Sequence, residues 1–190
     1  ATRIVKKFGD DTFRIMEEEP ERLAEVKGIS MRKALEISGA VAGKRDLRQA
    51  MLFLQQYGIT QNPGMKIYSF YQGRLYQVIR ENPYKLADDI DGVGFRIADE
   101  IASKAGILPD SDFRIRSGIL YVLEQATGQG HTCLPMDQLM QEARRLLGVE
   151  IDSMNDRIMD LIMDKKIVVK TKEDIQMVYS SVSYYTELTI

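Results

Sequence analysis

The apolar positions of the first third of the chain recur in the second third with the same spacing. Residues 4–23 match residues 67–86 at a constant offset of 63, and after a one-residue insertion residues 26–37 match residues 90–101 at an offset of 64. Each copy ends in an apolar residue, a tight turn of a glycine, an aliphatic and a small residue, and a new helix. The paired positions include Phe8 and Tyr71, Phe13 and Tyr76, Ile15 and Val78, Met16 and Ile79, Pro20 and Pro83, Val26 and Ile90, Gly28 and Gly92, Ile29 and Val93, Ala34 and Ala98, and Ile37 and Ile101. A match of this length predicts an internal repeat.

An amphipathic helix is predicted between the two copies, over residues 46–57. Its apolar residues recur at spacings of three and four, the period of a helix with one buried face. The helix ends in a third turn of the same kind, Gly58-Ile59-Thr60, and helical residues follow from Met65. Ser30 and Thr60 are predicted N-caps, because a hydroxyl at that position can accept a hydrogen bond from the first helical turn.

Residues 107–112 (ILPDSD) indicate a domain boundary, because they combine a proline with cap-forming polar residues. Before this boundary, we expect short helices in a tandem hairpin domain over residues 1–108. Its parts are repeat units over about 3–43 and 66–106, linked by a third hairpin over about 46–71.

The remaining chain predicts a small α+β domain over residues 109–190. Helical periodicity covers residues 113–127, 136–147 and 153–165, whereas 166–171 and 174–180 read as a β-hairpin and 131–134 as a third short strand. This order is typical of a winged-helix domain. The expected fold class is therefore mainly α: tandem repeats of helical hairpins, followed by a small winged-helix-like α+β domain with a C-terminal β-hairpin.

Composition adds limits on the class of protein. The 190 residues are 44% hydrophobic, which is enough for a core, and no apolar run approaches the 18 or so residues that cross a bilayer. The first residues lack the apolar stretch of a signal peptide, so we expect a globular cytoplasmic protein with no membrane partner. The chain starts at Ala1 inside an apparent helix and reads as a piece of a longer protein.

The charge is distributed unevenly. The formal net charge is −2, but residues 1–63 carry 11 Lys or Arg against 9 Asp or Glu, residues 64–108 carry 6 against 6, and residues 109–190 carry 9 against 13. This balance argues against bulk electrostatic coating of nucleic acid, and it predicts that a polyanion meets the N-terminal part first.

The glycine turns are candidate phosphate sites. The glycine permits the reversal, the aliphatic residue points inward, and the next residues open a helix whose free amides and positive dipole end face outward. Such a site contacts phosphate and no base edge, so recognition would be independent of sequence. The candidate DNA-phosphate-binding residues are Gly28, Ile29, Ser30, Arg32, Lys33, Gly58, Thr60, Lys66, Gly92, Val93, Gly94 and Arg96.

These turns resemble the helix-hairpin-helix motif of DNA repair and recombination proteins. Residues 23–37 (LAEVKGISMRKALEI) and 86–101 (LADDIDGVGFRIADEI) carry the pattern, and residues 55–66 are a weaker copy. Lys27, Arg32 and Lys33 favour phosphate contact at the first turn. The second turn is surrounded by acidic residues and reads at least as well as a purely structural hairpin; these are Asp88, Asp89, Asp91, Asp99 and Glu100.

No catalytic or metal-binding constellation is predicted. Residues 39–45 (GAVAGKR) imitate a phosphate-binding loop but are one residue short and lack Ser or Thr after the lysine. His131 and Cys133 are too few for a zinc site. A catalytic aspartate of the base-excision glycosylase type could be sought at Asp110 or Asp112, but the chain has no tryptophan to hold a flipped base.

An acidic stripe is predicted on one face of the last long helix. Its members recur every four residues: Asp152, Asp156, Asp160 and Asp164. They would oppose insertion of this helix into a DNA groove. The stripe is either a solvated face or a contact for a basic protein partner.

The order of these parts resembles the N-terminal region of the RecD/TraA-type DNA helicases, the long stand-alone form of RecD, from about residue 3 to residue 187. One departure is Ser30, where the pattern usually has a second glycine. The residues that carry the resemblance are Phe8-Gly9, 19–23, 51–54, 57–59, 81–86, 92–95, 98–99, 115–121, Gly130-His131 and Leu134-Pro135.

The resemblance implies a function for the parent protein. In that family such a region precedes an ATP-dependent motor that unwinds DNA in the 5′ to 3′ direction, so the motor, with its ATP and Mg²⁺, would lie after Ile190. The fragment itself would need no cofactor. Two hypotheses remain: an accessory region that binds duplex, fork or junction DNA for a repair or recombination helicase, or a scaffold that positions the motor or a protein partner without binding DNA.

Overall fold

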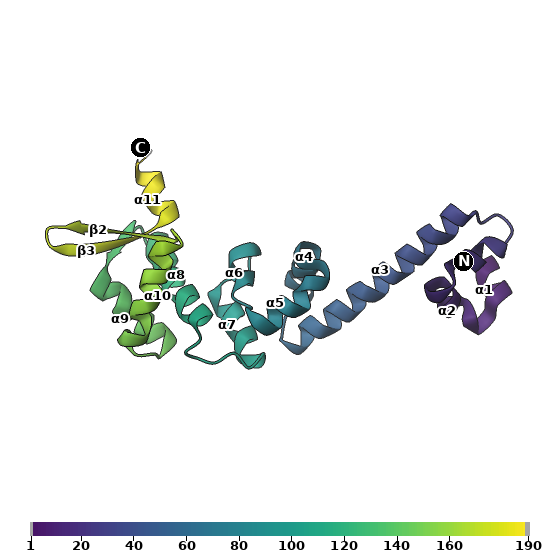
Figure 1. Cartoon of the computed structure of the whole chain (residues 1–190), viewed down its shortest axis with the longest axis horizontal. Helices are drawn as coiled ribbons and strands as arrows, with labels where there is room; N and C mark the ends of the chain where they lie inside the picture. Colours follow the sequence, from purple (N-terminus) through teal and green to yellow (C-terminus); the bar gives the residue numbers. More distant parts are fainter. Residues whose placement is uncertain (1, 189–190) are drawn as a thin grey trace. The chain divides into compact units, whose positions relative to one another are not determined.

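The computed structural model describes residues 2–188, and the chain divides into two compact units, residues 1–69 and 70–190 (Figure 1). The division falls inside helix α4 (Gln61–Tyr71). The chain is mainly helical, with one small antiparallel sheet, as the sequence pattern predicts. No helix within residues 2–188 is long and apolar enough to span a membrane.

Unit 1 has its N-terminal core at the beginning of a long helix. The core contains Ile4, Ile15 and Leu23 and is closed by Ala34 and by partly buried residues that include Ile29. Figure 1 shows α1 and α2 gathered at that end of α3. The elements are α1 (Thr2–Phe8), η1 (Gly9–Asp11), α2 (Thr12–Glu18), η2 (Pro20–Glu25), α3 (Met31–Gln56) and the greater part of α4.

Helix α3 is one continuous element of 26 residues. The sequence pattern indicates a break between residues 43 and 46, and that break is absent. Gly39 and Gly43 stand in an exposed stretch where glycine costs only about 1 kcal/mol against alanine, which lowers helix stability without ending the helix. The expected N-cap is confirmed: Ser30 Oγ accepts a hydrogen bond from the amide of Lys33 at 3.2 Å.

Unit 2 combines short helices with a three-stranded sheet of order β1-β3-β2, in which both pairings are antiparallel. The β2–β3 hairpin confirms the predicted C-terminal hairpin. Helix α11 was not predicted. The elements are η3 (Gln72–Arg74), α5 (Leu75–Glu81), α6 (Lys85–Asp89), α7 (Phe95–Lys104), α8 (Asp112–Gly128), β1 (Cys133–Pro135), α9 (Met136–Leu147), α10 (Ile151–Met163), β2 (Ile167–Lys172), β3 (Ile175–Ser180) and α11 (Ser181–Leu188).

The core of unit 2 runs across the boundary that the sequence predicts at residue 108. Tyr84 and Phe95 belong to the same buried cluster as Ile119 of α8, Leu139 of α9 and Val178 of β3. The rings of Tyr84 and Phe95 stack with centroids 5.9 Å apart. The segment that holds the second glycine turn is thus packed into the same core as the sheet. The predicted domain division and the winged-helix interpretation stay predictions.

The offset of 63 also relates the bounds of the secondary structure. Helix α1 ends at Phe8 and α4 at Tyr71; a single 3₁₀ turn follows in both, and then α2 covers 12–18 and α5 covers 75–81. Even the unusual backbone angles agree, because Gly9 and Gln72 both have positive φ, at 54° and 51°. The two segments therefore have the same order of elements up to residues 18 and 81. Before the glycine turns they differ, because η2 is a 3₁₀-helix over 20–25 and α6 is an α-helix over 85–89.

Candidate nucleic-acid interface

The first glycine turn joins η2 to α3. Gly28 has φ +94°, a region that residues with a Cβ rarely adopt. The amide of Ile29 donates to the carbonyl of Val26 at 3.0 Å, and the Ile29 side chain packs on the unit 1 core. The glycine is therefore required for the reversal, and the aliphatic residue holds the hairpin against the core.

The other two turns repeat this arrangement. Gly58 and Gly92 have φ +78° and +89°. Ile59 and Val93 are buried, and their amides donate to Leu54 O at 3.2 Å and Ile90 O at 3.0 Å. The amides of Ile29, Ile59 and Val93 are thus occupied inside the hairpins and do not face a ligand.

The amide that follows each aliphatic residue is available. Ser30, Thr60 and Gly94 are exposed, and none of their amides donates a hydrogen bond in the part of the chain that the structure describes. Each of these residues precedes the helix α3, α4 or α7, whose N-terminal end attracts anions. The turns are open to solvent and are not covered by neighbouring side chains.

A basic groove lies beside the first turn. It has a volume of about 570 Å³, and Val26 is its one aliphatic lining residue. Four cations outnumber one carboxylate around it, and the guanidinium of Arg3 lies 3.6 Å from the position that a Cβ on Gly28 would take. The groove is lined by Arg3, Lys6, Lys7, Glu25, Val26, Lys27 and Gly28.

Most of these cations have no carboxylate partner. Lys7 is paired, with its ammonium 3.1 Å from Glu25 Oε2 and donating to the Glu25 carbonyl at 3.0 Å. Among residues 2–188, no carboxylate oxygen lies within 4 Å of the charged nitrogens of Arg3, Lys6 or Lys27. Unpaired cations beside an exposed amide attract phosphate, because phosphate gives them the anionic partner that they lack in the fold.

Three cations of the groove, Arg3, Lys6 and Lys7, were not among the predicted site residues. They stand about 20 positions before the turn and reach it because Ile4 of α1 is buried in the unit 1 core. Their spacing of three and four residues, which places them on one helix face, is the signal that could have indicated them.

Two predicted cations lie outside this groove. Arg32 is 91% exposed and pairs with Glu36 at 3.1 Å along α3. Lys33 is exposed in the first turn of α3. Of the cations predicted at the other turns, Arg96 is exposed on α7 and Lys66 is exposed on α4.

The acidic surroundings of the second turn are built into unit 2. Asp89 accepts a hydrogen bond from the Tyr71 hydroxyl at 2.5 Å, and Asp99 accepts from Tyr84 at 2.6 Å and from Arg114 Nε at 2.8 Å. Burial, reinforced by Asp99, raises the pKa of Tyr84 well above its ordinary value. Arg114 also donates to the carbonyls of Pro109 and Leu147, each at 2.8 Å. We call Tyr84, Asp99 and Arg114 the acidic clamp.

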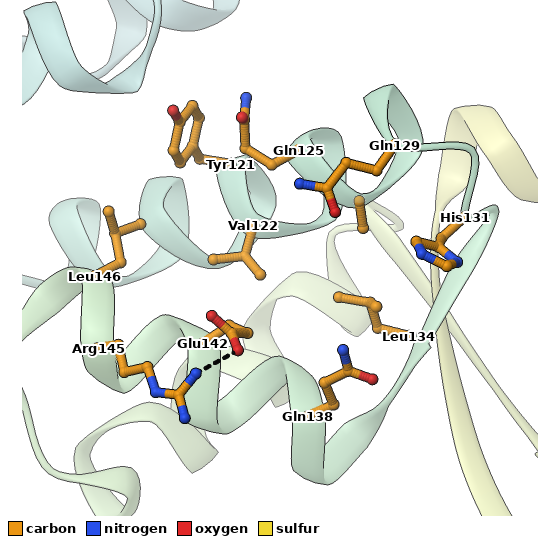
Figure 2. A pocket seen from close by; sticks show the side chains of 11 residues that line it. Tyr121, Val122, Gln125, Gln129, His131, Leu134, Gln138, Glu142, Arg145 and Leu146 are labelled. Atoms are coloured by element: carbon orange, nitrogen blue, oxygen red, sulfur yellow. Dashed lines mark hydrogen bonds and ion pairs between the residues drawn. The ribbon is translucent and has the colours of Figure 1, made fainter.

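A second cavity lies between α8, β1 and α9 and has a volume of about 490 Å³ (Figure 2). Its floor is apolar and includes Val122 and Leu134, and its one ion pair, Glu142 with Arg145 at 2.8 Å, neutralises itself. His131 stands at its edge. It offers no excess of positive charge and is a poorer site for phosphate than the basic groove.

The remaining residues that the sequence suggested for catalysis or phosphate binding lie within helices or ion pairs. Residues 39–45 lie inside α3, so they cannot form a phosphate-binding loop. Asp112 pairs with Arg157 and is the first residue of α8, whose N-cap is Ser111. Residues 2–188 hold no group of three or more His, Cys, Asp or Glu side chains placed to bind a metal.

The acidic stripe of α10 is partly neutralised. Asp160 pairs with Arg157 at 3.2 Å, and Asp164 pairs with Arg116 of α8. Asp152 and Asp156 are exposed. Asp164 therefore links the end of α10 to α8, Asp160 is paired within α10, and the other two aspartates are solvated.

Known proteins share the sequence around the second and third turns. Residues 43–133 match the family model for the HHH domain of ATP-dependent RecD2 DNA helicases. The ATP-dependent RecD2 DNA helicase of Deinococcus radiodurans is 26% identical over 136 residues, which are 71% of this chain and 19% of that protein. The chain thus spans about a fifth of the length of this curated relative. Residues 43–133 contain the Gly58 and Gly92 turns and begin after the first turn. Residues 43–133 of this chain are therefore similar to the helix-hairpin-helix domain of RecD-type DNA helicases.

Proposed function

We propose that this chain is the DNA-binding accessory region of an ATP-dependent 5′ to 3′ DNA helicase, with the motor elsewhere in the polypeptide. The basic groove beside the Gly28 turn is the observation that carries this proposal, because it gathers several unpaired cations at the turn that leads into α3. The motor supplies ATP hydrolysis with Mg²⁺. We assign the helicase to DNA repair or recombination in the cytoplasm.

The groove binds the sugar-phosphate backbone. Arg3, Lys6 and Lys27 contact phosphate oxygens, and the Ser30 amide adds a hydrogen bond at the positive end of α3. Phosphate contacts carry no sequence information, so binding through them is independent of sequence. This region thus holds DNA while the motor moves along it.

The test is a titration of labelled duplex and forked DNA with the full chain at two salt concentrations. Affinity should fall as salt rises, with a slope of log K against log[salt] of about −0.9 for each phosphate contacted. The double variant Arg3→Glu, Lys27→Glu should weaken binding at least about 100-fold at low salt, since two attractive charges become repulsive.

A matched control is Lys44→Glu with Arg48→Glu. It makes the same change in net charge at exposed positions of α3, well beyond the groove. It should reduce affinity only a few-fold. Binding that does not respond to salt, or an equal loss in both double variants, would contradict the proposal.

A second function is favoured by the acidic clamp. Because Asp99 is bound by Tyr84 and Arg114, the second hairpin is part of a rigid core. Such a hairpin fits a scaffold that positions the motor or a basic protein partner. Under this function neither DNA form binds, at either salt concentration.

A further inference from the structure

One carboxylate stands among the cations of the basic groove. Glu25 is the last residue of η2, and its Oε2 lies 3.1 Å from the ammonium of Lys7 while its Oε1 lies 3.3 Å from Arg22 Nε. The hydrogen bond from Lys7 holds the pKa of the Glu25 carboxyl below its ordinary value. Glu25 is therefore ionised at neutral pH.

Lys7 is occupied by this carboxylate. Its ammonium contacts both the side chain and the main-chain carbonyl of Glu25, whereas Arg3, Lys6 and Lys27 have no such partner within the described residues. The groove thus contains four cations but offers three. A carboxylate fixed in the same fold also acts at a high effective concentration, so a dilute small anion does not displace it.

The second copy has a carboxylate at the matching position. Asp89 stands 64 residues after Glu25 and accepts from the hydroxyl of Tyr71, at the end of α4. The partner of Asp89 is thus a neutral hydroxyl, and no lysine or arginine within residues 2–188 forms an ion pair with this carboxylate. In the first copy the carboxylate at this position, Glu25, pairs with Lys7, so Lys7 is not available to a ligand.

We propose that Glu25 sets the affinity of the groove for a nucleic-acid backbone by keeping Lys7 out of the binding site. This inference rests on the proposed function. Glu25 acts as an internal competitor: it occupies the place beside Lys7 that a phosphate would otherwise take. Phosphodiesters then meet Arg3, Lys6 and Lys27, and the chain releases DNA more readily than four free cations would allow.

The test compares Glu25→Gln with the wild-type chain on labelled duplex DNA over a series of salt concentrations. Glutamine keeps the shape and can still accept hydrogen bonds from Lys7 and Arg22. Freed from the charge, Lys7 should join the site. Affinity at low salt should rise about three- to tenfold, and the slope of log K against log[salt] should steepen by about 0.9, the value for one more phosphate contact.

Glu21→Gln is the matched control, since it removes the same charge from an exposed position of the same 3₁₀-helix. It should leave the slope unchanged. Lys7→Gln alone should also leave the slope unchanged, and the double variant Lys7→Gln, Glu25→Gln should return it to the wild-type value.

Two results would overturn the inference while the proposed function stands. One is a slope for Glu25→Gln equal to that of Glu21→Gln. The other is a shallower slope for Lys7→Gln alone, which needs no Glu25 variant and would show that Lys7 already binds phosphate. A wild-type chain that binds no DNA at low salt would instead remove the proposed function and this inference together.

Discussion

The turns at Gly28 and Gly92 share a backbone and differ in their surroundings. Their φ angles are +94° and +89°, and in both the next amide donates inside the hairpin at 3.0 Å. Lys27 of the first turn corresponds to Asp91 of the second. The first turn faces unpaired cations, whereas the carboxylates near the second are hydrogen-bonded to tyrosines and Arg114.

This difference shows that the geometry of the hairpin turn and the ability to bind phosphate have separate causes. A glycine, an inward aliphatic residue and a helix are enough to make the turn. Binding of phosphate needs charge as well. In the first copy, α1 adds cations to Lys27 of the turn, whereas in the second copy the nearby charges include Asp99 of the acidic clamp.

The largest effect is expected from the acidic clamp. Arg114→Ala leaves Asp99 with Tyr84 alone and removes the donor for two carbonyls. Breaking such a largely buried pair should lower the free energy of unfolding by about 2–4 kcal/mol. Arg22→Ala, which removes only exposed ion pairs near the first turn, should cost much less stability, because solvent screens such pairs. Urea unfolding measures the loss of unfolding free energy in both variants. Equal losses would contradict the view that Arg114 is a structural residue and that the pairs of Arg22 are solvated.

Exchange of charge between the turns is the next test. Lys27→Asp gives the first turn the residue of the second, and it should weaken duplex binding about tenfold at low salt, or about 1.4 kcal/mol. Asp91→Lys should strengthen it less than about threefold, because Asp89 and Asp99 remain nearby. Fluorescence anisotropy with labelled duplex measures both. Equal and opposite changes would mean that only net charge matters.

The shared backbone should make the two glycines respond alike. Gly28→Ala and Gly92→Ala each force a Cβ into a positive-φ conformation, which should cost about 1–2 kcal/mol of stability. Gly43→Ala is the control: its Cβ meets nothing within 4 Å on α3, and it should stabilise the chain by about 0.5–1 kcal/mol. Thermal or urea unfolding reports all three, and a neutral Gly28→Ala would refute the need for glycine at the turn.

The smallest effect is an opposite response to acid in the two regions. Burial raises the pKa of Asp88 and of Glu124, so their regions gain stability as pH falls from neutrality toward the ordinary carboxyl value of about 4. Hydrogen bonds from Arg14 and from Lys7 lower the pKa values of Glu19 and Glu25 respectively, so the first hairpin loses stability as pH falls further, through those lowered values. Hydrogen exchange measured residue by residue separates the two responses. If acid changed the local stability of α6 and η2 in the same direction, the two predicted responses would be contradicted.

Local patterns in the sequence predict much of the fold. The apolar periodicity gives α9 as residues 136–147, identical to its observed bounds, and gives α8 and α10 to within two residues. The β-hairpin and the Ser30 cap follow from residue type alone. These features depend on neighbours within a few positions, which is the range that a sequence pattern describes.

Long-range contacts account for what the pattern missed. Arg3 reaches the Gly28 turn only because α1 packs on a core that includes Leu23, and Arg114 reaches Asp99 from the following helix. Helix α3 was expected in two pieces because its middle has no apolar period. None of its residues from Leu35 to Gln49 is fully buried, but Ile37 and Val41 pack against the unit 1 core, and Arg45 pairs with Glu17 of α2 at 2.7 Å. These long-range contacts support the helix there.

Because α3 is one continuous helix, it fixes the spacing between the glycine turns at its two ends. At 1.5 Å per residue, the 26 residues of α3 make a helix about 39 Å long, and the Gly28 and Gly58 reversals lie just beyond its two ends. One turn of duplex measures about 34–36 Å, so α3 is comparable in length to a single helical repeat of DNA. Shortening or kinking α3 would change the spacing of the two glycine turns within unit 1 and leave the residues of both turns unchanged.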